Sequence, residues 1–229
     1  MMKRTILAAA TALVLMLPGF AADTQLLPAT PPAQLLPSPP TDGSAAQKRE
    51  LDEIHQAQQG MTDADFDQAA ADDKTEDASV FNGVVGIDLK TLPKTWALLA
   101  TVRNEEKTAA KIAKNTFLRN RPWVLDPALK TCTRGDAPRS SYPSGHSTMA
   151  YSMAVILAAM IPEKAPAILD RAKAYAENRI VCGVHYRSDI VAGQVLGTTV
   201  AEELLTVGAF QADFKLAQME LRTALKSGR

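Results

Sequence analysis

The residues best able to do chemistry in this 229-residue chain gather between positions 141 and 193. Two of its three histidines, His146 and His185, lie there. Ser144 and Gly145 directly precede the first histidine and could offer a hydroxyl and backbone N–H donors to an anion at the start of a helix. Imidazoles serve as nucleophiles, acids or bases near neutral pH. The pattern indicates a site for reaction at an oxyanion.

Charged residues accompany these histidines. Arg179 precedes His185 and Asp189 follows it, whereas Lys114 and Arg121 lie upstream, seven positions apart. Seven residues make two helical turns, so a helix would place both cations on one face. Cations and imidazoles, without a cysteine nucleophile or a carboxylate cage for a metal, indicate phosphoryl transfer through histidine.

Hydrophobic periodicity predicts only helices around these residues. We expect helical segments within 47–79 and over Asp88–Leu99, Thr101–Arg119, Ser147–Met160, Ala165–Ile180 and Asp189–Leu205, followed by an amphipathic tail, with a loop over 123–140. The segment Ser147–Met160 is apolar nearly all round and should be the buried central helix. The expected fold class is all-α, a compact multi-helix bundle around that helix.

The start of the chain is typical of a secretory signal peptide over residues 1–21. Lys3 and Arg4 precede a short apolar run that ends in small residues, with cleavage expected after Ala21 or Ala22. The run of about 13 apolar residues is too short for a membrane anchor, which needs roughly 20. We therefore expect a periplasmic mature protein without a membrane span.

Two further regions follow the signal. Residues 22–46 are proline-rich and should be extended rather than helical, either wrapping the domain through their leucines or tethering it. Residues 47–229 should form one catalytic domain, a size that can bury a proper core. Lys plus Arg and Asp plus Glu both number 25, so no basic excess indicates a nucleic-acid partner.

Three other features carry less weight. Cys132 and Cys182, the only cysteines, could form one disulfide that ties two pieces of the site together or could remain two buried thiols, and the expected export favours the bridge. His55 has no partner histidine or cysteine nearby and is expected at the solvated surface. The acidic clusters Asp72-Asp73 and Glu76-Asp77 are expected to be a solvated turn rather than a cation site.

Three blocks of the sequence resemble the signature of the type-2 phosphatidic acid phosphatase superfamily. They are Lys114 with Arg121-Pro122, then Pro143-Ser144-Gly145-His146, then Arg179 with His185 and Asp189. The context of the blocks, Ser141-Tyr142 and the run 181–189, is similar to the bacterial class A nonspecific acid phosphatases. The resemblance extends from about residue 44 to the C-terminus, and its three blocks in order make it specific.

This resemblance implies a role for each residue. His185 would attack phosphorus and become a phosphohistidine, Asp189 would orient it, and His146 would act as general acid and base. The phosphoryl oxygens would be held by Lys114, Arg121, Ser144, Gly145 and Arg179. No metal or other cofactor is implied, and the partners would be small-molecule phosphomonoesters. A homo-oligomer is compatible with the resemblance, and so is phosphate transfer to alcohols.

Other interpretations stay open at this point. Lys114 and Arg121 could be surface charges, Ser144 and Gly145 could merely cap a helix, and Arg179 could pair with Asp189 structurally. The chain could also be a vanadate-dependent haloperoxidase, whose family shares this type of pocket, or a non-catalytic phosphate-binding module. Membrane lipid phosphatases of the superfamily are a less suitable comparison, because they need several spanning helices and the sequence predicts none.

One position departs from the family pattern. Residue 178 is Asn where a Ser usually precedes the arginine. Asn can donate a hydrogen bond as Ser does. We therefore expect activity to be retained.

Overall fold

The computed structural model describes residues 25–28 and 32–228, and this part of the chain consists of helices and loops without a strand. The helices are α1 (Pro32–Leu35), α2 (Ala45–Gly60), α3 (Asp63–Lys74), α4 (Asn82–Val85), α5 (Pro93–Phe117), α6 (Pro122–Leu125), α7 (Gly145–Met160), α8 (Ala165–Val181), α9 (Arg187–Thr206) and α10 (Gly208–Lys226), with 3₁₀ turns at Ala78–Phe81, Leu89–Thr91 and Pro162–Lys164. The all-α expectation is confirmed.

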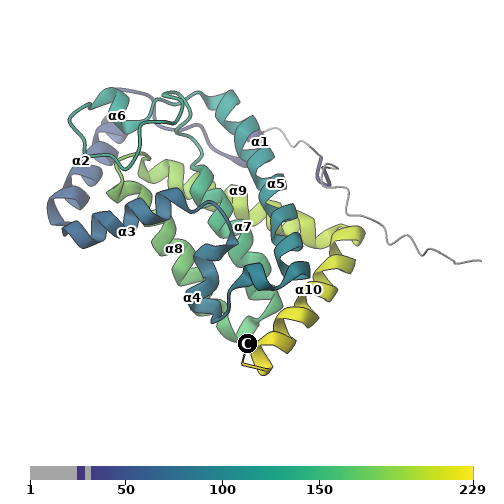
Figure 1. Ribbon diagram of the computed structural model, residues 1–229. Helices are drawn as coiled ribbons and strands as arrows, with labels where there is room; N and C mark the ends of the chain where they lie inside the picture. Colours follow the sequence, from purple (N-terminus) through teal and green to yellow (C-terminus); the bar gives the residue numbers. More distant parts are fainter. Residues whose placement is uncertain (1–24, 29–31, 229) are drawn as a thin grey trace, which may run out of the picture.

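Helix α7 lies at the centre of the bundle, as expected from its apolar composition. It packs against α5, α8 and α9 (Figure 1), which cover most of its circumference. Met149, Met153, Ile156 and Leu157 are all buried to 1 % exposure or less. A helix that is apolar all round is stable in water only where neighbours surround it, which explains this position.

Two glycines of α9 set how closely it approaches α7. A Cβ atom added at Gly193 would lie 2.7 Å from the Ser144 carbonyl oxygen, and one at Gly197 would come closer still to that of Thr148. The backbones can touch there only because glycine has no side chain. The close packing brings the start of α7 next to the start of α9, where the Ser144 N–H donates to the Asp189 carbonyl at 3.0 Å.

Helix α5 corrects two expectations. The stretches expected as separate helices over Asp88–Leu99 and Thr101–Arg119 are largely one helix, which begins at Pro93 because proline fits a first helical turn. The helix ends at Phe117, since Leu118 adopts a left-handed conformation with φ of 48°. Arg121 therefore lies outside the helix, and the predicted helical face shared by Lys114 and Arg121 does not exist.

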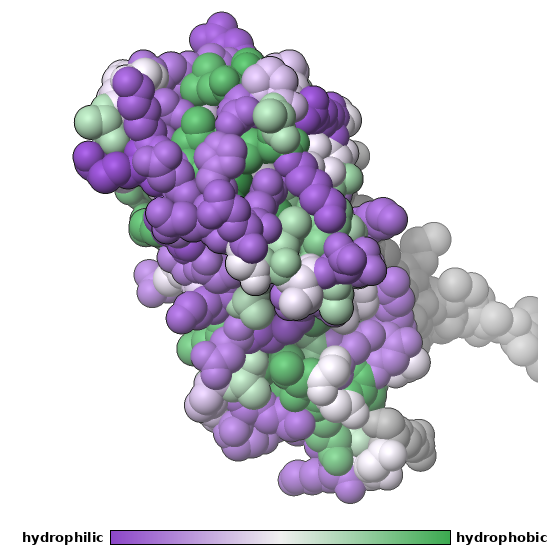
Figure 2. All heavy atoms as spheres, turned by 90° about the vertical axis from the view of Figure 1, so that its left-hand side faces the viewer, coloured by the Kyte–Doolittle hydropathy of each residue, from purple (hydrophilic) through white to green (hydrophobic). Residues whose placement is uncertain are grey.

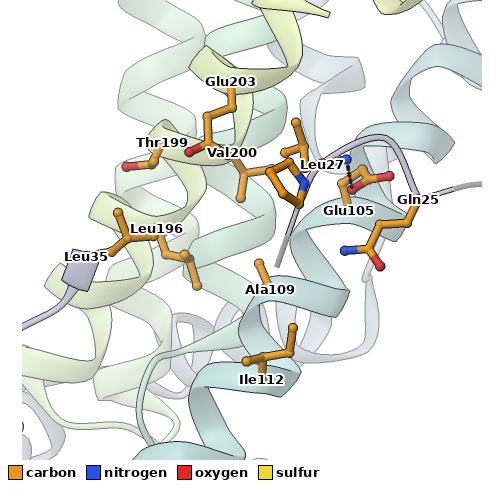
Figure 3. A pocket seen from close by; sticks show the side chains of 11 residues that line it. Gln25, Leu27, Leu35, Glu105, Ala109, Ile112, Leu196, Thr199, Val200 and Glu203 are labelled. Carbon is orange, nitrogen blue, oxygen red and sulfur yellow. Dashed lines mark hydrogen bonds between the residues drawn. The ribbon is translucent and has the colours of Figure 1, made fainter. Parts of the chain in front are cut away.

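The described parts of the proline-rich segment, residues 25–28 and 32–46, pack against the domain through their leucines. Leu26, Leu27, Leu35 and Leu36 pack against the core. The buried carboxylate of Glu105 on α5 accepts the backbone N–H groups of Leu26 at 2.6 Å and Leu27 at 3.3 Å (Figure 3). The segment also forms the single turn α1, contrary to expectation, because a proline at the start of a helix loses no hydrogen bond. The predicted signal peptide and its cleavage site lie outside the described residues.

Among the described residues, no single helix is both long enough and apolar enough to cross a membrane. Helices α9 and α10 meet that criterion only when taken together, and they are bent by 95° at their junction. The face on the side of α2 and α3 is mainly hydrophilic, with hydrophobic side chains in small separate groups (Figure 2).

Candidate active site

His185 and Asp189 form a buried pair at the start of α9. His185 Nδ1 lies 3.3 Å from Asp189 Oδ2, which also accepts from Ser141 Oγ at 2.5 Å and from the Tyr186 N–H at 2.8 Å. Because an ionised carboxylate only accepts, Nδ1 of His185 carries the hydrogen and Nε2 keeps its lone pair. That lone pair lies 3.4 Å from Arg121 Nη1. The geometry leaves an unprotonated ring nitrogen facing a cation.

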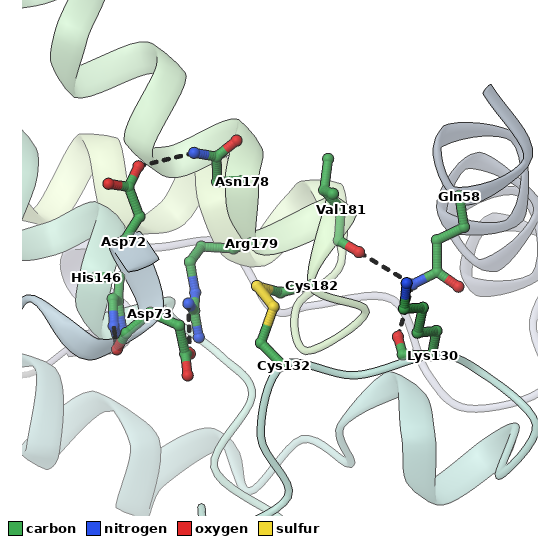
Figure 4. Close-up of a disulfide and its surroundings, with 10 residues drawn as sticks. All are labelled: Gln58, Asp72, Asp73, Lys130, Cys132, His146, Asn178, Arg179, Val181 and Cys182. Carbon is green, nitrogen blue, oxygen red and sulfur yellow. Dashed lines mark hydrogen bonds and ion pairs between the residues drawn. A yellow bond between two sulfur atoms is a disulfide. The ribbon is translucent and has the colours of Figure 1, made fainter. Parts of the chain in front are cut away.

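His146 is the second residue of α7 and presents the opposite nitrogen. Its Nε2 lies 3.1 Å from the backbone carbonyl oxygen of Asp73 (Figure 4). A carbonyl oxygen can only accept, so Nε2 carries the hydrogen and Nδ1 is left to exchange a proton. The ring stacks on Tyr175 with centroids 5.6 Å apart. His146 is thus held in one tautomer and one orientation.

Lys114 and Arg121 converge on Ser140 although they share no helix face. Lys114 Nζ donates to the Ser140 carbonyl at 2.7 Å, and Arg121 Nη2 donates to Ser140 Oγ at 3.3 Å. Arg121 Nη2 also lies 3.1 Å from Asp136 Oδ2, whose side chain is 44 % exposed. A Cβ atom at Gly145 would lie 3.8 Å from Lys114 Cε, so the lysine reaches the start of α7. The turn at Leu118 brings these cations together.

Arg179 lies in the last turn of α8 and is fully buried. Its Nη1 lies 2.6 Å from Asp73 Oδ1 (Figure 4), but within the described residues none of its three guanidinium nitrogens makes a well-aligned hydrogen bond. Buried donors are almost always satisfied, so such an arginine is suited to bind an anion. Arg179 does not pair with Asp189, which excludes the structural pair considered above.

Ser144 caps the N-terminus of α7, which was one of the interpretations open from the sequence. Its side-chain oxygen accepts from the Ser147 N–H at 3.4 Å, and Thr148 Oγ1 donates to its carbonyl at 2.8 Å. A cap does not exclude a second role, because a hydroxyl that accepts one hydrogen bond still has its own hydrogen to donate. Its role toward a phosphoryl group, with that of Gly145, stays a prediction.

Burial and neighbouring cations shift the titration of this cluster. Burial, reinforced by Arg179, lowers the pKa of His146 well below its usual value. Burial, reinforced by Arg121 and Lys114, does the same to the pKa of His185. Burial lowers the pKa of Lys114 to about 8, with Arg121 as the next cause. Cations crowded together without an anion favour neutral imidazoles, and a bound oxyanion would relieve that repulsion.

The acidic residues at the end of α3 correct another expectation. Asp72 and Asp73 are not a solvated turn: Asp72 lies 2.6 Å from Arg171 Nη2 and accepts from Asn178 Nδ2 at 2.7 Å. Asn178 therefore donates a hydrogen bond, as expected, and links α8 to α3. His55 is partly exposed and lies 2.8 Å from Asp126. Composition indicated exposure for the acidic cluster, whereas the partners that bury it come from about 100 residues away.

A disulfide joins Cys132 to Cys182, with Cα atoms 5.0 Å apart. It fixes the loop after α6 to the end of α8, three residues before His185 (Figure 4). The Cys132 N–H donates to the Cys182 carbonyl at 3.3 Å beside it. The bridge predicted between two parts of the site is confirmed.

Sequence reasoning missed several residues that complete the site. Arg119, Ser141 and Tyr186 contact the Asp189 carboxylate, and Asp73 contacts both Arg179 and His146. The one available signal was proximity along the chain to motif residues. Arg119 lies two positions before Arg121, and Ser141 lies three before Ser144.

A family comparison covers the region that holds the site. The model of the PAP2 superfamily matches residues 95–211. Fold similarity agrees with it: a transmembrane PAP2-type phosphatidylglycerolphosphate phosphatase from Bacillus subtilis aligns with a TM-score of 0.55 at 19% identity, covering 75% of this chain and 88% of that one.

Relatives in sequence extend beyond that region. An acid phosphatase of Zymomonas mobilis is 33% identical over 86% of this chain and 77% of its own length. A non-specific acid phosphatase of Salmonella typhimurium is 32% identical over 81% of this chain and 78% of its own length. With the three motif blocks assembled in one helical fold, the chain belongs to the PAP2 superfamily and, within it, to the family of the bacterial acid phosphatases.

Proposed function

We propose that the protein is a periplasmic acid phosphatase that hydrolyses small organic phosphomonoesters through a phosphohistidine on His185, without a metal. The observation that carries the proposal is the orientation of His185. Asp189 holds its Nδ1 hydrogen, which directs the Nε2 lone pair toward the side where Arg121 lies. Membership of the acid phosphatase family supports the reaction class.

In the first step, Nε2 of His185 donates its lone pair to phosphorus, and the bond from phosphorus to the ester oxygen breaks. The leaving alkoxide takes a proton from Nδ1 of His146, whose Nε2–H keeps its hydrogen bond to the Asp73 carbonyl. Positive charge develops on the His185 ring, next to the Asp189 carboxylate, which stabilises it. The products are an alcohol and an N-phosphorylated His185.

In the second step, water attacks the phosphorus of the intermediate. His146 Nδ1, now unprotonated, accepts a proton from the water, and the bond from phosphorus to Nε2 breaks, so that its electron pair returns to His185. Inorganic phosphate leaves and both histidines regain their starting states. One imidazole thus acts first as an acid and then as a base.

Charge stabilisation supplies much of the rate enhancement in this scheme. The transition state of phosphoryl transfer spreads negative charge over three oxygens, and preorganised cations in a buried site stabilise it strongly. Lys114, Arg121 and Arg179 are the cations, and Ser144 with Gly145 supplies further donors at the start of α7. The unmatched guanidinium nitrogens of Arg179 support this assignment.

Broad specificity and export are the finer parts of the proposal. The named groups all address the phosphoryl group, so the organic part of the substrate is left unspecified. The name of the Salmonella relative, a non-specific acid phosphatase, agrees with that breadth. Export is supported by the basic and apolar start of the chain and by the disulfide.

The test is hydrolysis of p-nitrophenyl phosphate at mildly acidic pH, with EDTA and with or without vanadate. The proposal predicts turnover that resists EDTA, is blocked by vanadate and is lost in His185→Ala. Exchange of the exposed Lys111, three residues from Lys114 on α5, should leave turnover unchanged. Halide oxidation that appears only with vanadate, in the absence of phosphatase activity, would instead support a haloperoxidase.

A further inference from the structure

Arg119 differs from the other cations near the histidines in what it contacts. Its side chain is 2 % exposed. Nη1 lies 2.6 Å from Asp189 Oδ1 and donates to Ser188 Oγ at 2.7 Å, and Nη2 lies 2.6 Å from Glu50 Oε2. Its guanidinium also stacks over the Tyr186 ring, 4.1 Å from the centroid. Two carboxylates thus occupy the terminal nitrogens of Arg119. Among the described residues only its Nε has no hydrogen-bond partner, whereas all three guanidinium nitrogens of Arg179 have none.

The main chain of Arg119 contacts the same aspartate by a second route. Its carbonyl accepts the Ser141 N–H at 3.1 Å, and Ser141 Oγ donates to Asp189 Oδ2 at 2.5 Å. Asp189 is therefore held through one oxygen by the Arg119 side chain and through the other by a residue that Arg119 positions. His185 Nδ1 shares this second oxygen.

A fully buried carboxylate without a cation takes up a proton readily, because burial disfavours its charged form. A protonated Asp189 would stop accepting the Nδ1 hydrogen of His185, and the ring would no longer be held in its nucleophilic tautomer. Lys114 and Arg121 act on Asp189 from a distance. Arg119 is the cation in direct contact with it.

Helix α2 extends this arrangement outside the region that the family model matches. Glu50 also accepts the Ser188 N–H at 2.6 Å, and Gln47, three residues earlier, donates to the Tyr186 hydroxyl at 3.3 Å. Residues three apart lie on one helical face, so this face of α2 docks on the start of α9. Glu50 lies 45 positions before the first matched residue, 95.

We propose that Arg119 is a positioning residue for this reaction: held in place by Glu50 of α2, Arg119 keeps Asp189 ionised and oriented, so that Asp189 fixes the Nδ1 hydrogen of His185. The proposal rests on the phosphohistidine function above. It assigns to a helix outside the matched family region a part in holding the nucleophile.

The test is the pH dependence of kcat/KM for p-nitrophenyl phosphate in Arg119→Gln, Arg119→Lys and Glu50→Gln. The charged groups around Asp189 are Arg119, Glu50, His185 and, further away, Lys114 and Arg121. Arg119→Gln should lower kcat on the order of 10- to 100-fold and move the acidic limb of the pH profile upward, because a buried carboxylate that has lost its adjacent cation takes up a proton more readily. Arg119→Lys keeps the charge and should largely restore the limb, with a lower kcat because the two-pronged contact is lost.

Glu50→Gln changes the charge near Asp189 in the opposite direction from Arg119→Gln. It removes a negative charge beside Arg119, so the acidic limb should stay in place or move downward. Arg187→Gln is the matched control. Arg187 lies two residues before Asp189 and also joins α9 to α2, through its ion pair with Glu53. Loss of the Arg187 charge should lower the free energy of unfolding without moving the acidic limb of the kcat/KM profile. A uniform loss of activity with an unmoved limb in Arg119→Gln would overturn the proposal, and so would unchanged activity.

A second readout does not depend on turnover. In protein labelled with ¹⁵N-histidine, the ring nitrogens of His185 should show hydrogen on Nδ1 in the wild type at mildly acidic pH and lose that preference in Arg119→Gln. Resonances are assigned by exchanging His55 and His146. If Arg119→Gln does not fold, Arg119→Lys decides, because a large upward shift of its acidic limb would contradict the proposal. An inactive but folded wild type with the expected tautomer would reject the phosphatase function and leave the positioning role standing.

Discussion

The two histidines differ in which nitrogen is committed to the protein. His185 commits Nδ1 to the carboxylate of Asp189, and His146 commits Nε2 to the carbonyl of Asp73. A carboxylate would stabilise positive charge on the ring that we propose attacks phosphorus. A carbonyl only orients the ring, so His146 remains free to gain and lose a proton. The partners therefore suit the two histidines to different steps.

Replacement of His146 should affect substrates according to their leaving group. In His146→Asn, hydrolysis of an alkyl phosphate should fall by about 10² to 10⁴-fold, because the poor leaving group needs a proton. Release of p-nitrophenolate from p-nitrophenyl phosphate in a single turnover should fall much less, since p-nitrophenolate leaves without a proton. Equal losses for both substrates in single-turnover assays would contradict the role of acid.

The lowered pKa of His146 also predicts an acidic optimum. Its protonated form is lost as pH rises toward neutrality, so the rate for an alkyl phosphate should fall over that range. A maximum well above neutral pH in the wild-type profile would argue against His146 as the acid.

Lys114 should determine how substrate binding changes at alkaline pH. With a pKa of about 8, it is charged below that pH and neutral above it. KM for p-nitrophenyl phosphate should therefore rise above about pH 8, and Lys114→Met should raise KM at lower pH and remove this break. Lys111→Met, on the exposed side of α5, should behave like the wild type. A break that persists in Lys114→Met would assign it to another group.

At the scale of elements, the site depends on how closely two helices approach. Gly193 and Gly197 let α9 lie against α7 with their backbones in contact. The start of each helix then surrounds one of the histidines. His146 lies in the first turn of α7, and Asp189 in the first turn of α9 contacts His185. His146 lies on α7 and His185 lies in the short connection just before α9, so the contact between these helices helps to bring the two imidazoles to one site.

Gly197→Ala should disturb both stability and activity. The added Cβ would collide with the Thr148 carbonyl, so α9 must move. Overpacking of this kind costs about 1 to 3 kcal/mol in the free energy of unfolding, and kcat should fall because the histidines separate. Gly60→Ala at the end of α2, where the added atom meets no other within 4 Å, is the control. Urea unfolding and kcat that match the wild type in Gly197→Ala would show that α7 and α9 tolerate a wider spacing.

Several elements could be predicted from sequence, and the reasons for the exceptions are physical. The pattern of apolar residues located α7, α8 and α9 because each helix buries an apolar face, and α7 buries most of its residues. It did not reveal the turn at Leu118, since a left-handed leucine has no sequence signal comparable to glycine. It also failed for Asp72 and Asp73, whose partners Arg171 and Arg179 lie about 100 residues away.

At the scale of the whole molecule, segments far apart in sequence hold the site together. The chain before α2 packs its leucines on the core, α2 contacts α9 through Glu50, and the disulfide joins Cys132 to Cys182. The motif blocks could be recognised from sequence because their residues are close along the chain. Arg119 and Glu50 could not, since their pairing needs the folded arrangement of α2 and α9.

Loss of the disulfide should weaken the fold more than the chemistry. The bridge spans 50 residues, and a loop of that size stabilises by about 2 to 4 kcal/mol, chiefly through the unfolded chain. The Cys132→Ser, Cys182→Ser double variant should lose about that much free energy of unfolding, and so unfold at a lower urea concentration, while keeping measurable kcat at low temperature. Reductant should shift the wild-type urea midpoint but not that of the variant, and an unshifted wild type would contradict a stabilising bridge.

The central claim is that His185 becomes phosphorylated during turnover. The most direct measurement is rapid quenching of the EDTA-treated protein with ³²P-labelled phosphomonoester, followed by peptide mapping. We predict an acid-labile, alkali-stable label on the peptide that contains His185, absent from His185→Ala and accumulating more in a variant of His146 when the leaving group is p-nitrophenolate. Turnover by a wild type that never carries the label, or a label that persists in His185→Ala, would contradict the account.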